Sequence, residues 1–179
     1  MSPTSHPAPR SRSVGTVAQA LEVAQRFLAT RPRSENEVRR RLLRAGCDAP
    51  VLDMVLDRLR RAGLLDDAAF ASYWLDQRQT FKPRGARLLR AELRQRGVSA
   101  ELASATTALT AETAEDDAYR AAYRRAMQLA HLDEHTFKIK LGQLLARRGF
   151  DWDTIGPTVE RLRRELLSTS SNSARAPNR

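Results

Sequence analysis

A short segment that occurs three times along the chain constrains the fold most strongly. Each copy contains a leucine, a glycine four residues later and a small or apolar residue directly after that glycine. The copies are Leu42–Cys47, Leu93–Val98 and Leu145–Phe150, with glycines 51 and 52 residues apart. This pattern is typical of a helix C-terminus that is closed by glycine in the left-handed conformation. The near-equal spacings indicate a true repeat rather than chance similarity among leucine-rich helices.

The apolar residues around these segments recur at helical spacing, as in Leu52, Val55, Leu56 and Leu59. No stretch alternates strictly enough to predict a strand. A further helix is expected to begin within about five residues of each glycine, and another precedes each central helix. The preceding helices are expected at 18–29, 67–80 and 114–129. The sequence therefore predicts an all-α chain of about nine helices, three to each repeat.

Helix start and stop signals agree with this prediction. Ser34 with Glu37, and Thr113 with Asp116, have the spacing of a capping box. Gly63 marks a further expected helix end. Both ends of the chain are rich in Ser, Pro and Arg without apolar periodicity, so we expect disordered tails there. The expected segments are an N-terminal tail at 1–16, repeats at 17–62, 63–110 and 111–167, and a C-terminal tail at 168–179.

The formal net charge of +10 predicts attraction to a polyanion, with nucleic acid as the first candidate. Arginine supplies 28 of the 31 basic residues. Arginine suits bidentate contacts with phosphate, although a GC-rich coding bias explains the ratio equally well. The charge thus predicts a kind of partner and leaves the fold open.

A row of arginines is the clearest positive signal for a binding surface. Arg84, Arg87, Arg90 and Arg94 gather on one side of an expected helix whose other side is apolar. Such a row can neutralise phosphates or contact an acidic protein surface, and a merely solvated face is the alternative. By charge and spacing we add four more candidates from the third repeat: Lys138, Lys140, Arg147 and Arg148.

One string resembles a metal site. His131, Glu134 and His135 match the H-x-x-E-H pattern of some zinc peptidases. The string falls where one expected helix ends and the next begins, and a linker does not hold two histidines rigidly on one face. The only other histidine is His6, in the expected tail. We expect no metal and no cofactor.

No other motif indicates catalysis. Cys47 occupies the position of an apolar residue in the other two copies, which predicts a small core residue. Asp66 and Asp67 are interpreted as a helix cap and a first-turn acid. The glycines are scattered singly and form no phosphate-binding loop. We therefore expect a binding protein and not an enzyme.

A second class of binding protein, tandem helix-turn-helix modules that recognise DNA sequence, requires a basic third helix in each unit. The middle unit lacks one, because residues 98–119 contain no Arg or Lys and several acidic residues. Sequence-specific DNA recognition by all three units is therefore not expected.

The cellular compartment is predicted from the absence of sequence features that mark secreted and membrane proteins. The single cysteine excludes an internal disulfide. No apolar run approaches the roughly 20 residues of a membrane helix, and the first thirteen residues do not form a secretory signal. We expect a cytoplasmic protein without membrane contact.

Three segments carry a resemblance to a known family. The segments Gly63–Ala71, Gly85–Val98 and Leu145–Phe150 resemble the RecX recombination regulators, and the resemblance spans residues 18–167. Val38 and Leu144 depart from the residues common at those positions, which affects packing only.

The resemblance implies an elongated, curved array of three three-helix repeats. It also implies a protein that binds the RecA recombinase, along or at the end of the RecA filament on single-stranded DNA, with direct DNA contact as an open possibility. We expect a monomer. It implies suppression of the ATPase, strand-exchange and coprotease activities of RecA during DNA repair, recombination and the SOS response. The alternative is a non-specific helical DNA-binding protein without a recombinase partner.

Overall fold

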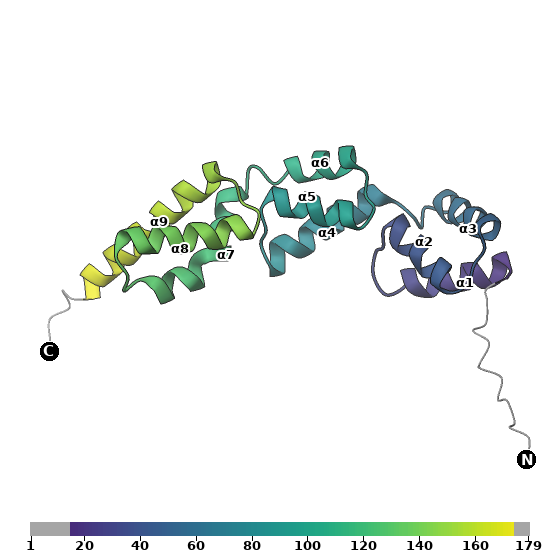
Figure 1. Cartoon of the computed structure of the whole chain (residues 1–179), viewed down its shortest axis with the longest axis horizontal. Coiled ribbons are helices and arrows are strands. Elements are labelled where there is room, and N and C mark those ends of the chain that lie inside the picture. Colours follow the sequence, from purple (N-terminus) through teal and green to yellow (C-terminus); the bar gives the residue numbers. More distant parts are fainter. Residues whose placement is uncertain (1–14, 174–179) are drawn as a thin grey trace, which may run out of the picture. The chain divides into compact units, whose positions relative to one another are not determined.

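The computed structural model describes residues 15–173, which form nine α-helices and no strand (Figure 1). The expectation of an all-α chain is confirmed for this part. The helices are α1 (Val17–Leu28), α2 (Glu35–Arg44), α3 (Ala49–Arg61), α4 (Asp67–Phe81), α5 (Ala86–Gln95), α6 (Ala100–Ala108), α7 (Ala114–Leu129), α8 (Glu134–Arg147) and α9 (Trp152–Ser173).

The helices belong to two compact units. Unit 1 contains α1 to α3, the start of α4 up to Phe70, and residues 96–98. Unit 2 contains the rest of α4, the whole of α5, and α6 to α9. The repeat boundaries expected from the sequence stay a prediction.

The repeated glycines end helices as predicted. Gly46, Gly97 and Gly149 have φ angles of +80°, +89° and +88°, in the left-handed region that a side chain disfavours. After Gly149, the N–H of Phe150 donates to the carbonyl oxygen of Leu145 at 3.2 Å. Cys47 and Leu42 repeat this bond at the same distance. This is the hydrogen bond of a Schellman helix end, so the stop signals are confirmed.

The two capping predictions have different outcomes. At α2 the hydroxyl of Ser34 accepts the N–H of Glu37, and the Glu37 carboxylate accepts the N–H of Ser34, which confirms the capping box. At α7 the prediction is wrong, because Thr113 makes no side-chain cap. Its backbone is not extended (φ −101°, ψ 1°), and its hydroxyl contacts Thr110 and Asp117 instead.

Each unit has its own apolar core. In unit 1 the buried faces of α1, α2 and α3 meet around Val38, Leu42 and Leu56. Cys47 belongs to this core as predicted, and burial raises the pKa of its thiol. In unit 2 the buried faces of α7, α8 and α9 meet around Phe137 and Leu141.

Helix α9 continues to Ser173, beyond residue 167 where we expected the folded part to end. Residues 168–173 contain no glycine or proline, the two residues that disfavour a helix most. The other residues expected to form tails, 1–14 and 174–179, lie outside the described residues.

Inside unit 2 hydrogen bonds join the end of α8 to the start of α5. The N–H of Gly85 donates to the carbonyl oxygen of Arg148 at 3.0 Å, and the Arg87 guanidinium donates to that of Ala146 at 2.6 Å. Gly149 lies directly against Leu88, so that a Cβ on Gly149 would approach the Leu88 Cβ to 2.4 Å. This close approach places the basic end of α8 beside the α4–α5 turn.

Candidate anion-binding groove

A groove of about 750 Å³ lies in unit 2 between the α4–α5 turn, α7 and the end of α8. We call it the basic groove because, of the described residues that line it, seven are basic and none is acidic. The basic residues are Lys82, Arg84, Arg120, Arg124, Arg125, Arg147 and Arg148.

Local structure explains how these side chains converge. Arg120 and Arg124 are four residues apart on α7 and therefore share one face of that helix. Arg147 ends α8, and the Gly85–Arg148 hydrogen bond holds the α4–α5 turn against the same helix end. Lys82 lies in that turn. Three separate elements thus direct cations into one groove.

Two of the seven cations are already paired with buried carboxylates. Arg84 forms an ion pair with Glu92, whose side chain also accepts the indole N–H of Trp74 at 2.8 Å and Nε of Arg78 at 2.9 Å. Arg120 pairs with Asp117, which is 2% exposed. Burying an unpaired carboxylate is costly, so these pairs are part of the fold. Their guanidinium groups are less available to a ligand.

The other five cations are not paired with a carboxylate in the described part of the chain. Among the described residues, no carboxylate forms a salt bridge with any member of this set. The set comprises Lys82, Arg124, Arg125, Arg147 and Arg148. The Arg148 guanidinium donates to the carbonyl oxygen of Ala121, which orients it without neutralising it. A groove walled by charges of one sign concentrates anions and suits a polyanion such as a nucleic-acid backbone.

The structure brings only part of the predicted site into this groove. Arg84, Arg147 and Arg148 line it. Arg90 and Arg94 are exposed on α5 but do not line it, and Arg87 is held by the Ala146 carbonyl. That Arg87, Arg90 and Arg94 bind a partner stays a prediction.

The two lysines of α8 also lie apart from the groove lining. Lys138 forms salt bridges of 2.6 Å with both Glu134 and Glu160. Lys140 is exposed. Both stay predicted contacts without support from the groove geometry.

Sequence reasoning missed four groove residues: Lys82, Arg120, Arg124 and Arg125. The spacing of Arg120 and Arg124 is a signal that could have identified them, since i and i+4 share a helix face. The first turn of α7 is acidic, with Glu115, Asp116 and Asp117, so the composition of its start does not indicate a basic surface.

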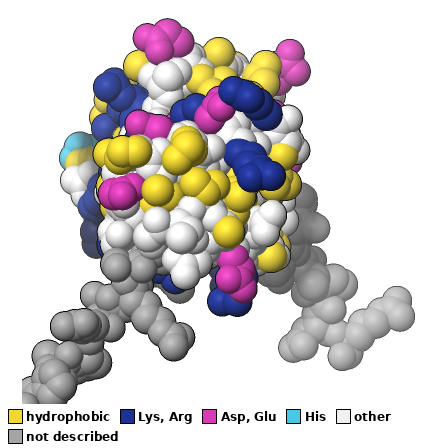
Figure 2. All heavy atoms as spheres, turned by 90° about the vertical axis from the view of Figure 1, so that its right-hand side faces the viewer, with side chains coloured by type: hydrophobic (Ala, Val, Ile, Leu, Met, Phe, Trp, Pro, Cys, Tyr) yellow, Lys and Arg dark blue, Asp and Glu magenta, His cyan; other side chains and the backbone are white. Residues whose placement is uncertain are grey.

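The face of unit 1 in Figure 2 has a different character. Hydrophobic side chains gather near its middle, and both basic and acidic side chains lie around them. Among the exposed apolar residues of this unit are Leu43, Met54 and Leu64, each about half exposed. A mixed-charge face is less suited than the basic groove to a polyanion.

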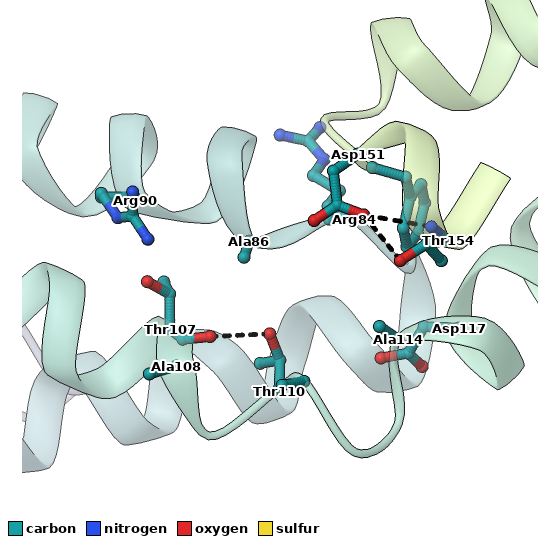
Figure 3. Close-up of a pocket in the computed structure, with 13 residues that line it drawn as sticks. Arg84, Ala86, Arg90, Thr107, Ala108, Thr110, Ala114, Asp117, Asp151 and Thr154 are labelled. Atoms are coloured by element: carbon teal, nitrogen blue, oxygen red, sulfur yellow. Dashed lines mark hydrogen bonds between the residues drawn. The ribbon is translucent and has the colours of Figure 1, made fainter.

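A second, smaller pocket of about 120 Å³ lies in unit 2 among α5, α6 and the start of α9 (Figure 3). Its lining combines Arg84 and Arg90 with Asp117 and Asp151. Asp151 accepts hydrogen bonds from the backbone and hydroxyl of Thr154, at 3.2 and 2.8 Å. Because charges of both signs line this pocket, it does not present the uniform potential of the basic groove.

The other motifs have structural roles. Asp66 accepts the N–H groups of Ala68 and Ala69, as the predicted cap of α4. The segment from His131 to His135 spans the break between α7 and α8, as predicted. Within residues 15–173, no group of three His, Cys, Asp or Glu side chains could hold a metal ion. No helix described by the structure combines the length and apolarity needed to cross a membrane.

Comparison with known proteins adds two family matches. A family model described as the first three-helix domain of RecX matches residues 20–59, and one described as the second three-helix domain of RecX matches residues 66–106.

Individual relatives agree. The regulatory protein RecX of Mycobacteroides abscessus is 38% identical over 134 residues, which cover 74% of this chain and 66% of the relative. The regulatory protein RecX of Chlorobium limicola is 35% identical over 144 residues, 80% of this chain and 89% of the relative. The crystal structure of RecX from Lactobacillus salivarius has a TM-score of 0.75 at 18% identity, covering 82% of this chain and 96% of that one, and shows the fold alone.

Proposed function

This chain belongs to the RecX family of regulatory proteins, and on that premise we propose that it binds the RecA recombinase on single-stranded DNA and inhibits it. The inhibited activities are the ATPase, strand exchange and coprotease action. The protein acts as a cytoplasmic monomer without catalysis of its own. Close relatives that carry the name of a regulatory protein support the regulatory role.

The basic groove is the observation that supports a filament as the target. A recombinase filament presents DNA phosphates and acidic protein surface together, and five cations that form no salt bridge with a described carboxylate suit both. We propose that Arg147 and Arg148 contact the filament from the groove. The exposed Arg90 and Arg94 supply further contacts from α5.

The second candidate is a non-specific DNA-binding protein without a recombinase partner. The single sign of charge in the groove favours it, because non-specific binding requires only phosphate contacts. Such binding weakens steeply with salt, whereas binding to a protein partner adds contacts that salt screens less.

Sedimentation of RecA filaments separates the two candidates. The salt concentration is first raised until the protein no longer sediments with bare single-stranded DNA. At that salt, the proposed function predicts that the protein still sediments with RecA filaments formed on the same DNA. Equal loss from filaments and bare DNA would contradict it and favour the second candidate.

A further inference from the structure

Phe81 is an aromatic side chain that is largely exposed to solvent. It ends α4, lines the basic groove and is 71% exposed. Its neighbour Lys82 carries one of the five groove charges that no carboxylate within the described residues pairs with. An aromatic ring beside unneutralised cations combines the two features with which proteins hold single-stranded nucleic acid, a stacking surface and an electrostatic track.

The cations around the ring suit a phosphate backbone. Arg124 and Arg147 are exposed, come from two different helices and contact no carboxylate among the described residues. A planar guanidinium can donate two parallel hydrogen bonds to one phosphate. Lys82, Arg124 and Arg147 thus offer contacts to a charged chain that passes along the groove beside Phe81.

We propose that the basic groove binds a single strand of nucleic acid, with phosphates on Lys82, Arg124 and Arg147 and one base stacked on Phe81. The ring discriminates against a duplex, whose bases are already stacked on one another and present no free face. This inference rests on the proposed function, because it uses the same groove. It names a nucleic-acid strand, and not an acidic protein surface, as the molecule bound there.

The test measures the fluorescence anisotropy of a labelled oligothymidine strand with the full-length protein and no recombinase. A strand of equal length without bases serves as the second probe, and a duplex as the third. Phe81→Leu keeps an apolar side chain but removes the aromatic face. We expect this variant to bind the thymidine strand about 5-fold or more weakly, since stacking on an aromatic ring is worth roughly 1 kcal/mol or more. Its affinity for the baseless strand should stay that of the unchanged protein.

The double substitution Arg124→Gln with Arg147→Gln should weaken binding to both single strands. It should also flatten the dependence of affinity on salt, because fewer phosphates are neutralised. Matched controls are Arg164→Gln, an exposed cation of α9 outside the groove lining, and Leu109→Ala, an apolar side chain that is 77% exposed outside it. Both controls should bind like the unchanged protein. Circular dichroism verifies that each variant stays helical.

Three results would overturn the proposal: equal affinity for the thymidine and baseless strands, equal affinity for single strand and duplex, or no effect of the double substitution. These outcomes are separable from failure of the proposed function. A protein that inhibits RecA but does not bind a strand in the groove refutes only this inference. A protein that binds the strand but leaves RecA unaffected refutes only the regulatory role.

Discussion

The hydroxyl of Ser34 donates a 2.6 Å hydrogen bond to the carbonyl oxygen of Arg96 while it accepts the N–H of Glu37 at the start of α2. Ser34 is fully buried. One side chain therefore satisfies a helix N-terminus and a carbonyl that follows α5, far along the chain. This contact joins residues 96–98 to unit 1, whereas the preceding helix α5 belongs to unit 2.

Substitution Ser34→Ala should lower the free energy of unfolding by about 2–3 kcal/mol, because it removes a cap and leaves a buried carbonyl unpaired. Ser99→Ala is the matched control, since Ser99 caps α6 through the N–H of Leu102 in an exposed position. The control should cost about 1 kcal/mol. Urea unfolding measures both, and equal losses would contradict the role assigned to the Ser34–Arg96 bond.

The contact between Gly149 and Leu88 predicts a second asymmetry. Gly149→Ala adds a Cβ within 2.4 Å of the Leu88 Cβ at a φ of +88°. Gly63→Ala, at φ +67°, places its Cβ in open space. Both variants incur the cost of a left-handed alanine, about 1–2 kcal/mol. Gly149→Ala should lose about 1–3 kcal/mol more from steric overlap, measured as the difference in urea unfolding energies. Equal losses of unfolding free energy would contradict a steric contact between Gly149 and Leu88.

The pKa of Glu35 predicts a dependence of stability on pH. Hydrogen bonds of 2.6 and 2.7 Å from Arg60 hold the pKa of this carboxyl below its usual value. The unfolded chain therefore binds the proton more readily than the folded chain. The stabilisation is present above the unfolded pKa, near 4.5, and is lost as the pH falls through the lower folded pKa.

The variants Glu35→Gln and Arg60→Gln test this sign. The unchanged protein should be more stable than either variant at pH 7, and the difference should shrink as the pH is lowered below about 4.5. Chemical unfolding at a series of pH values measures it. A difference that grows toward acid would contradict the assignment.

The two arginine sets make separate predictions for the filament. If the basic groove is the main contact, Arg124→Gln with Arg147→Gln should weaken filament binding more than Arg90→Gln with Arg94→Gln, although each pair removes two exposed cations. Each lost phosphate contact should lower the salt dependence of binding by about one unit of slope. Titration of filaments at several salt concentrations measures both effects. A larger effect of the α5 pair would contradict this and indicate that the arginine row on α5 makes the main contact.

The helix ends were predictable from the sequence because their signals are local. A leucine four residues before a glycine specifies both the buried helix face and the backbone bond of Phe150 to Leu145. The failed cap at Thr113 shows the limit of a spacing rule, since its hydroxyl contacts Asp117 instead.

The groove was only partly predictable, because its cations come from segments that packing brings together. Arg84 precedes α5, and its guanidinium pairs with Glu92, so it does not act as one of four equivalent surface arginines. Lys82 and Arg124 become neighbours in one groove only once the α4–α5 turn is fastened to the end of α8.

The most direct test of the regulatory role is the rate of DNA-dependent ATP hydrolysis by RecA with the protein added at well below one molecule per recombinase. The salt concentration is set so that the protein alone does not bind bare DNA. The account predicts that the rate falls, and that it falls less with the Arg124→Gln, Arg147→Gln variant. An unchanged rate with the unsubstituted protein would contradict the account.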